Sequence, residues 1–270
     1  MVSSASAETF GLSGRVCVVT GAASGIGRGV ALAVAGAGGR VAILDRSFEG
    51  AKATLDEIEG AGAAIACDVS DPASVAKSRR ADGGRAGSVR SAGQQRRSAQ
   101  ERHARNPFLR GLERVAVDQP HRLFPLRANL RPADAGGPQG VLVRIASIAA
   151  HHATPYSGAY SVAKAGVAML SRQLAIEWAP YGVRSNVVNP GMIFTPLSQS
   201  IHDPPGVAEL RAGLIPSGRI GRPSAAAEAV LFLASDRSAY INGDEITVDG
   251  GFTRNLMNLV PRAGYERPAG

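Results

Sequence analysis

The stretch GRVCVVTGAASGIGRGVALAVAGAG, residues 14–38, reads as a strand, a glycine-rich turn and a helix. Its first residues are mostly apolar, as in a buried strand, and small apolar residues recur at helical spacing after Gly25. Glycines at positions 21, 25 and 27 permit a tight turn, and they let main-chain N–H groups approach a phosphate at the positive end of the helix. The stretch therefore predicts a strand–turn–helix unit that binds a phosphate-bearing ligand.

The spacing of this turn, T-G-x-x-x-G-I-G, differs from the G-x-G-x-x-G dinucleotide fingerprint. A tight connection without any ligand would use glycines in the same way. The position of the turn between an apolar strand and a helix favours a dinucleotide cofactor. We predict that the cofactor is bound by Gly21, Ser24, Gly25, Ile26 and Gly27.

Strand and helix patterns alternate along the rest of the chain. Apolar strands are predicted at residues 40–45, 63–69, 140–147, 182–190 and 244–251, and helices at residues 48–62, 160–179 and 225–235. Nearly continuous apolar strands separated by helices are typical of a parallel sheet covered on both faces. We predict an α/β fold with a doubly wound parallel sheet of the Rossmann type. It would form one domain over residues 1–270, with an N-terminal extension (1–13) and a C-terminal tail (254–270).

The composition fits a single soluble domain. The chain has 270 residues, 44% of them hydrophobic, which is enough for one sizeable core. Neither a basic leader followed by an apolar run nor a stretch of about 20 apolar residues occurs, so we expect a cytoplasmic protein. Cys17 and Cys67 lie in apolar strand patterns, which indicates neither a disulfide framework nor a metal site.

Asp45 ends the second predicted strand, 24 residues after Gly21. An acid about 20 residues after the turn accepts hydrogen bonds from the ribose diol of NAD and repels the 2′-phosphate of NADP. We therefore predict NAD as the cofactor. Two alternatives remain open: Asp45 could cap the next helix, and Arg46 beside it could admit NADP.

Tyr160 and Lys164 are four residues apart in a helical pattern, so they share one face. A tyrosine hydroxyl titrates near pH ~10 and exchanges protons poorly at neutral pH. An ammonium ~4 Å away, at an effective dielectric constant of ~20, favours the phenolate by ~4 kcal/mol. Ser147 ends the preceding strand and can donate a hydrogen bond to a substrate oxygen. These three residues predict a site for general acid–base catalysis.

In combination these motifs resemble the short-chain dehydrogenase/reductases. The resemblance covers residues 11–77 and 141–253, and it rests on the glycine-rich turn, an Asp68-Val69 pair, Ser147, Tyr160-x-x-x-Lys164 and NPGMIFT at residues 189–195. It implies that the tyrosine is the acid/base, that the serine orients the substrate and that the lysine also binds the nicotinamide ribose.

The same resemblance implies further cofactor contacts. Asp68 and Val69 would flank the adenine, and the nicotinamide would be held by Pro190, Gly191, Ile193 and Thr195. Asp68 and Thr195 could instead be ordinary turn or cap residues.

Residues 78–140 depart from the pattern. They hold thirteen arginines, no lysine and five acids, an excess that equals the net charge of +8 of the whole chain. The family's Asn-Asn-Ala-Gly turn and its additional catalytic asparagine would fall in this segment, and neither is present. With suitable codons, the DNA that encodes Gln94-Gln95-Arg96-Arg97 encodes Asn-Asn-Ala-Gly when it is read one base later. The same shift over the codons of residues 118–124 yields Thr-Asn-Arg-Thr-Gly-Phe. We hypothesise that the segment is translated in the wrong frame. The alternative is a divergent or disordered arginine-rich insertion.

The function that the sequence favours is an oxidoreductase that transfers hydride between NAD(H) and a secondary alcohol or its ketone, with Tyr160 as general acid/base. One alternative is an NADP-dependent carbonyl reductase of the same family. Another is an inactive, basic scaffold that binds nucleic acid, although the arginine-rich segment lacks interleaved aromatic residues. The resemblance also implies a homo-oligomer, a tetramer or dimer. Residues 196–222 and the pair His151-His152 are expected to shape the pocket, but they do not identify the substrate.

Overall fold

A computed structural model describes residues 10–58, 62–81, 140–260 and 264. Within these ranges six strands are all parallel to their neighbours. They are β1 (Val16–Thr20), β2 (Arg40–Asp45), β3 (Gly62–Ala66), β4 (Gly140–Ile145), β5 (Val183–Pro190) and β6 (Glu245–Val248). They form two three-stranded sheets, β1-β2-β3 and β4-β5-β6.

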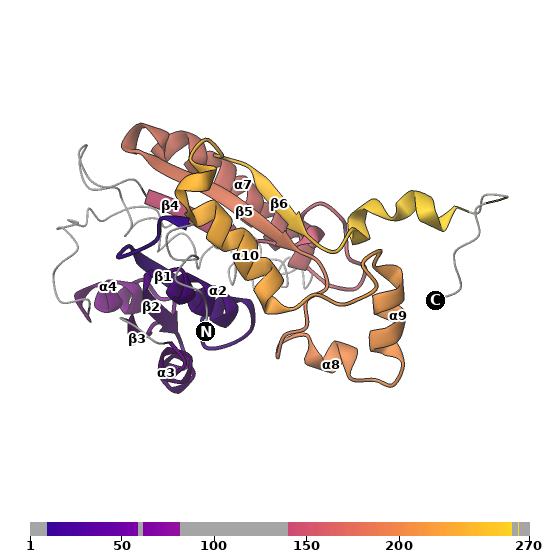
Figure 1. Cartoon of the computed structure of the whole chain (residues 1–270), viewed down its shortest axis with the longest axis horizontal. Helices are drawn as coiled ribbons and strands as arrows, with labels where there is room; N and C mark the ends of the chain where they lie inside the picture. Colours follow the sequence, from indigo (N-terminus) through magenta and orange to yellow (C-terminus); the bar gives the residue numbers. More distant parts are fainter. Residues whose placement is uncertain (1–9, 59–61, 82–139, 261–263, 265–270) are drawn as a thin grey trace, which may run out of the picture.

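Helices cover both faces of the strands. On one face, α10 (Pro223–Ala234) packs on α2 (Gly25–Gly36), which in turn contacts α3 (Phe48–Asp56). On the other face, α7 (Tyr160–Trp178) packs on β4 and β5, and α4 (Pro72–Ala81) contacts β3. Figure 1 shows α10 in front of β5 and α7 behind it. This arrangement confirms the predicted doubly wound α/β fold.

One hydrophobic core joins the two sheets. Ile43 of β2, Val188 of β5 and Leu231 of α10 belong to the same buried cluster, although they come from different sheets and from a helix. Leu12, which precedes β1, is buried in this cluster too. Because α2 and α10 pack on each other across the junction, the described residues form one domain, as predicted.

β1 and β4 each lie at one edge of their sheet. Along that edge neither strand has a partner among the described residues. Val16 and Val18 of β1 are 63% and 50% exposed, whereas a parallel strand inside a doubly wound sheet is normally covered on both faces. In a complete doubly wound sheet, a further strand would lie between β1 and β4. The arginine-rich segment, residues 78–140, would supply that strand. Residues 82–139 of that segment lie outside the described residues, and the reading-frame hypothesis stays a prediction.

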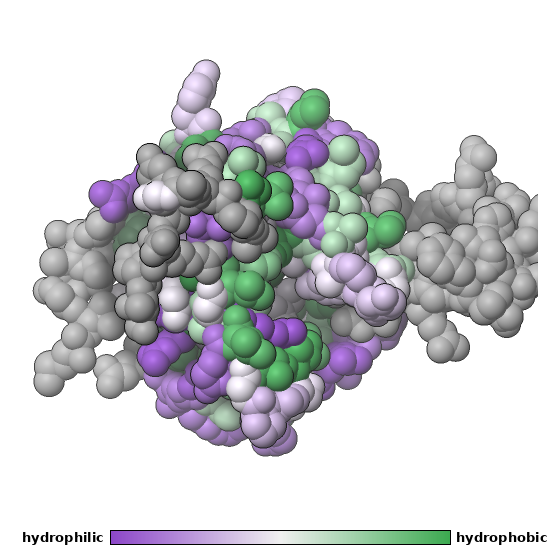
Figure 2. All heavy atoms as spheres, turned by 90° about the vertical axis from the view of Figure 1, so that its right-hand side faces the viewer, coloured by the Kyte–Doolittle hydropathy of each residue, from purple (hydrophilic) through white to green (hydrophobic). Residues whose placement is uncertain are grey.

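The segment between β5 and α10 extends to the right in Figure 1 and contains two short helices, α8 (Gln199–His202) and α9 (Val207–Leu214). Exposed apolar side chains gather on this side of the molecule. Figure 2, which faces this side, shows them as groups among hydrophilic residues. The exposed apolar residues of these segments include Leu197, Ile201, Leu210, Leu214, Leu256 and Met257.

Among the described residues, no helix combines the length and the apolar character needed to cross a membrane.

Candidate active site

The glycine-rich turn joins β1 to the first residue of α2. Gly21 and Gly25 have φ values of 66° and 56°, which side chains with a Cβ rarely adopt, and a Cβ on Gly27 would overlap the carbonyl oxygen of Gly21. The N-cap residue Ser24 makes no side-chain hydrogen bond to the helix, and the first turn contains no acid. The main-chain N–H groups at the start of α2 therefore suit a phosphate, and the glycine-rich turn fits the pyrophosphate of a dinucleotide. Ile26 packs against the core below the turn.

Asp45 lies at the end of β2 and faces this turn. Its Oδ2 accepts a hydrogen bond from the main-chain nitrogen of Ala23 at 3.1 Å, and its Oδ1 accepts one from Ser47 at 3.0 Å. The N-cap of α3 is Ser47, whose Oγ accepts from Gly50 at 3.1 Å. Asp45 is therefore not the cap of α3, and its carboxylate lies between the glycine-rich turn and the β2 end, where a ribose would be expected.

Two positively charged side chains lie near the end of β3. Arg46 and Lys77 line the same hollow of about 590 Å³, together with Asp68. Oδ1 of Asp68 accepts hydrogen bonds from the main chain and the hydroxyl of Ser70, so this side chain stabilises the turn that follows β3, and its contact with the adenine stays a prediction. Val69 packs against the small apolar cluster under that turn.

Ser147 follows β4 and begins a single 3₁₀ turn, η1 (Ile148–Ala150). Its Oγ is the cap of this turn, accepting from the main-chain nitrogen of Ala149 at 3.1 Å, and the residue is only 9% exposed. Because the oxygen acts as the acceptor there, the hydroxyl proton remains available for donation to another oxygen.

Tyr160 is the first residue of α7, the helix that packs against η1, and Lys164 lies about one turn later on the same face. Lys164 Nζ lies 5.7 Å from the centroid of the Tyr160 ring and donates a hydrogen bond to the main-chain oxygen of Ile145 at 3.2 Å. Burial lowers the pKa of Lys164 to about 8. Tyr160 is 37% exposed, so its ring is accessible to a substrate, whereas the ammonium is held inside. The sequence predicted this pair on one helix face, and the structure places it beside the Ser147 turn.

The segment after β5 approaches the glycine-rich turn. A Cβ built on Gly25 would lie 3.6 Å from the Cβ of Thr195, so these two parts of the predicted cofactor site are neighbours. Oγ1 of Thr195 also accepts a hydrogen bond from the main-chain nitrogen of Ser198 at 3.2 Å, a contact within the turn that precedes α8. Pro190 ends β5, the Gly191 nitrogen donates to Val248 at 2.9 Å, and Ile193 is buried.

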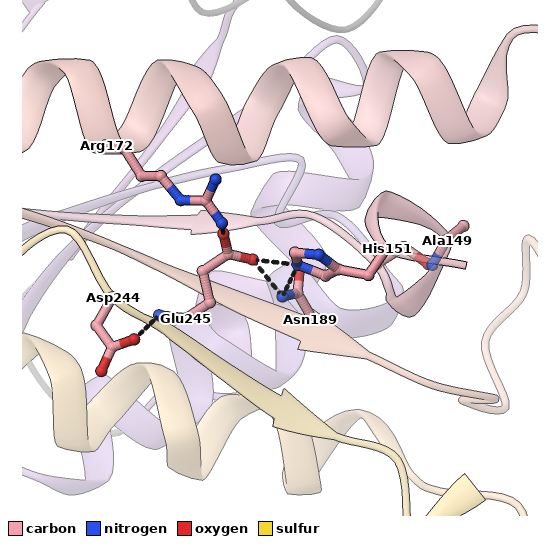
Figure 3. A network of polar contacts seen from close by, with 7 residues as sticks. Ala149, His151, Arg172, Asn189, Asp244 and Glu245 are labelled. Carbon is pink, nitrogen blue, oxygen red and sulfur yellow. Dashed lines mark hydrogen bonds and ion pairs between the residues drawn. The ribbon is translucent and has the colours of Figure 1, made fainter. Parts of the chain in front are cut away.

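The structure adds a polar cluster that the sequence did not predict (Figure 3). Glu245, the first residue of β6, accepts hydrogen bonds from Asn189 Nδ2 at 2.6 Å and from Arg172 at 2.5 Å, and it lies 2.7 Å from His151 Nε2. Its partners are 56, 73 and 94 residues away in the sequence, so no local motif signals the cluster. A hollow of about 420 Å³ opens beside it. The pair His151-His152, which was expected to shape the substrate pocket, lines this hollow, and His151 points toward Glu245.

Residues 21–253 match the family model described as enoyl-(acyl carrier protein) reductase. D-threitol dehydrogenase of Mycolicibacterium smegmatis is 38% identical over 252 residues, which span 90% of this chain and 95% of that protein. Cis-4-hydroxycyclohexanecarboxylate dehydrogenase of Sinomonas cyclohexanicum is 36% identical over 246 residues, spanning 88% and 96%.

Solved structures share the fold. The 3-ketoacyl-(acyl-carrier-protein) reductase of Brucella melitensis, crystallised with NADH, has a TM-score of 0.74 and is 30% identical, with 90% of this chain and 99% of that chain covered. A short-chain type dehydrogenase/reductase of Mycobacterium marinum has a TM-score of 0.73 and is 32% identical, with 90% and 96% covered.

Proposed function

Because the chain belongs to the short-chain dehydrogenase/reductase family, we propose that it transfers hydride between NAD(H) and a secondary alcohol or its ketone, with Tyr160 as general acid/base. The oxidoreductase class follows from the family and from the dehydrogenases that resemble this chain. The cofactor preference, the role of Tyr160 and the substrate type are the proposed part.

One observation carries the proposal: Lys164, Tyr160 and the Ser147 turn meet where α7 packs on the end of β4. Lys164 is tied to the main chain two residues before Ser147 and lies next to the Tyr160 ring. A cation in this position favours the phenolate form of the tyrosine, which is the form that accepts a proton.

In the direction of oxidation, the substrate hydroxyl loses its proton to the Tyr160 oxygen while its carbon loses a hydride. When it is bound, NAD supplies the acceptor for that hydride. The Ser147 hydroxyl donates a hydrogen bond to the substrate oxygen and stabilises the charge that develops on it. In the reverse direction Tyr160 returns the proton to the ketone oxygen.

Asp45 supports NAD as the preferred cofactor. A carboxylate beside the glycine-rich turn suits a ribose diol and repels a 2′-phosphate. Arg46 and Lys77, which line one hollow near the end of β3, favour the competing assignment, NADP. The ratio of kcat/KM with NAD to kcat/KM with NADP distinguishes these two assignments.

The relatives name the substrate class to test first. They are dehydrogenases of a small polyol and of a hydroxylated cyclohexane carboxylate, both of which carry secondary alcohols. The experiment follows NADH absorbance while the purified chain is offered threitol, cis-4-hydroxycyclohexanecarboxylate and cyclopentanol with NAD. We expect turnover of at least one, and its loss in Tyr160→Phe. No turnover with either cofactor across the panel, in both reaction directions, would overturn the proposal.

The family resemblance supports a homo-oligomer, either a dimer or a tetramer, as a secondary proposal. Light scattering coupled to size exclusion measures this directly. A monomer at micromolar concentration would contradict it.

A further inference from the structure

Glu245 connects three elements that approach the proposed active site. Its side chain is 11% exposed, and both carboxylate oxygens are engaged. Arg172 reaches it from α7, Asn189 from the end of β5 and His151 from the loop after η1, as Figure 3 shows.

The link through His151 leads directly to Ser147. The main chain from Ser147 to His151 is one 3₁₀ turn, closed by hydrogen bonds from Ala150 to Ser147 at 2.9 Å and from His151 to Ile148 at 3.0 Å. The Ser147 hydroxyl caps the start of this turn, and His151 is the residue at its other end. A single 3₁₀ turn has few hydrogen bonds of its own, so an anchor at its far end restricts where the serine hydroxyl lies.

The other two links lead to the remaining parts of the site. Asn189 immediately precedes Pro190 and Gly191, the segment proposed to hold the nicotinamide. Arg172 lies eight residues after Lys164 on α7, the helix that also carries Tyr160. One carboxylate therefore holds the serine turn, the nicotinamide segment and the tyrosine helix together.

The charge of Glu245 is preserved by its surroundings. Burial alone would raise its pKa, but the hydrogen bonds from Asn189 and His151, together with the charges of His151 and Arg172, outweigh that effect and lower the pKa from its ordinary value. The neighbouring acid Asp244 turns its Oδ1 to the main-chain nitrogen of Glu245 at 2.8 Å. At neutral pH the cluster is thus organised around a carboxylate anion.

We propose that Glu245 is a positioning residue that orients the Ser147 turn through His151. This inference rests on the proposed function, since Ser147 is a residue proposed to contact the substrate. Glu245 itself is not expected to touch either the substrate or the cofactor.

The test compares Glu245→Ala and Glu245→Gln with Glu177→Gln. Glu177 lies on α7 and, like Glu245, accepts a side-chain hydrogen bond, from Gln173 at 2.6 Å, but it is exposed. Misplacing a catalytic group by about 1 Å costs on the order of 100-fold in rate, so we expect kcat to fall about 10- to 100-fold in Glu245→Ala. Glu245→Gln keeps the shape and part of the hydrogen bonding, so kcat should be intermediate. The KM for NAD should change much less than kcat, and Glu177→Gln should behave as wild type.

A second measurement does not depend on turnover. Hydrogen–deuterium exchange of the peptide that contains residues 147–152 should be faster in Glu245→Ala than in wild type, and unchanged in Glu177→Gln. If Glu245→Ala does not fold, His151→Leu removes the link to the serine turn, together with the 3.4 Å contact between His151 Nε2 and Asn189 Nδ2, and leaves the contacts of Glu245 with Arg172 and Asn189. It should show the same loss of kcat and the same faster exchange.

The outcomes separate the two proposals. Wild-type protein that turns over none of the alcohols overturns the proposed function, whereas the exchange of residues 147–152 still tests whether Glu245 holds the serine turn. Active wild type with unchanged kcat and unchanged exchange in Glu245→Ala or His151→Leu overturns the positioning role alone. A fall in kcat without faster exchange also overturns it, because the serine turn would then not be what Glu245 holds.

Discussion

Lys164 donates a hydrogen bond from Nζ to the main-chain oxygen of Ile145 at 3.2 Å, and this contact ties the first turn of α7 to the end of β4, two residues before Ser147. Lys164 is 9% exposed, and among the described residues no acidic side chain forms an ion pair with its ammonium, so burying this charge costs stability. Such a cost is typical of a residue kept for chemistry rather than for folding.

The first prediction concerns this cost. Burial lowers the pKa of Lys164 from 10.5 to about 8, so between these values the unfolded chain binds more protons than the folded chain, and stability rises with pH. Relative to Lys164→Met, the wild type should therefore gain about 2 kcal/mol between pH 7 and pH 9.5, since each unit of pKa shift corresponds to about 1.4 kcal/mol. Urea unfolding at the two pH values measures the change.

Lys77→Met is the control for this experiment, because Lys77 lies on the exposed surface of α4. The stability difference between the wild type and this variant should be the same at both pH values. A constant difference for Lys164→Met as well would mean that the buried ammonium is not destabilising.

The second prediction concerns the proton donor and acceptor. Tyr160→Phe should lower kcat by about 10²- to 10⁴-fold, the usual contribution of general acid–base catalysis. NADH binding, followed by its fluorescence, should stay nearly unchanged because the phosphates are expected to contact the glycine-rich turn. Tyr240→Phe, a change on the surface, should keep full activity. Substantial residual turnover in Tyr160→Phe would mean that another group transfers the proton.

The third prediction concerns the cofactor. Asp45→Ala should lower kcat/KM for NAD and raise it for NADP, since the variant removes both the ribose acceptor and the repulsion of a 2′-phosphate. A tenfold change in the ratio corresponds to about 1.4 kcal/mol. Asp45→Asn removes the charge but keeps an acceptor oxygen for one of the two main-chain contacts, so it separates electrostatics from the local structure. Equal or better turnover with NADP by the unchanged chain would contradict the prediction.

Much of the fold follows from local pattern. The apolar run of β2 and the helical periodicity of α7 place both elements within a residue of their observed ends, because continuous burial dictates their composition. The helix α4 was not predicted, since its sequence PASVAKSRRA has little apolar periodicity. The third strand was predicted to reach residue 69, but it ends at Ala66, and Asp68 forms a turn two residues later.

In the candidate site, too, some residues could be predicted from local sequence pattern and others could not. Tyr160 and Lys164 are recognisable because their spacing on one helix is itself the geometry that the chemistry needs. Glu245 was not predicted, because an acid that begins a strand carries no signal of partners on three other elements. Its role depends on how β4, β5 and β6 align, which only the three-dimensional structure provides.

The last prediction concerns the arginine-rich segment. β1 and β4 both lack a strand partner on one edge among the described residues, and Val16 and Val18 are exposed where a complete doubly wound sheet would cover them. Arg96 and Arg97 in a central strand would each cost several kcal/mol, against a total stability of ~5–15 kcal/mol for a domain. We expect the coding DNA across codons 75–142 to contain two compensating frame changes, and the restored reading to encode Asn-Asn-Ala-Gly in place of Gln94–Arg97. The restored protein should unfold at a higher temperature than the chain as printed and should turn over alcohol faster. Tryptic peptide masses from the natural source decide the question, because peptides ending at Arg96 and Arg97 in an active, cooperatively folding enzyme would refute the frame hypothesis.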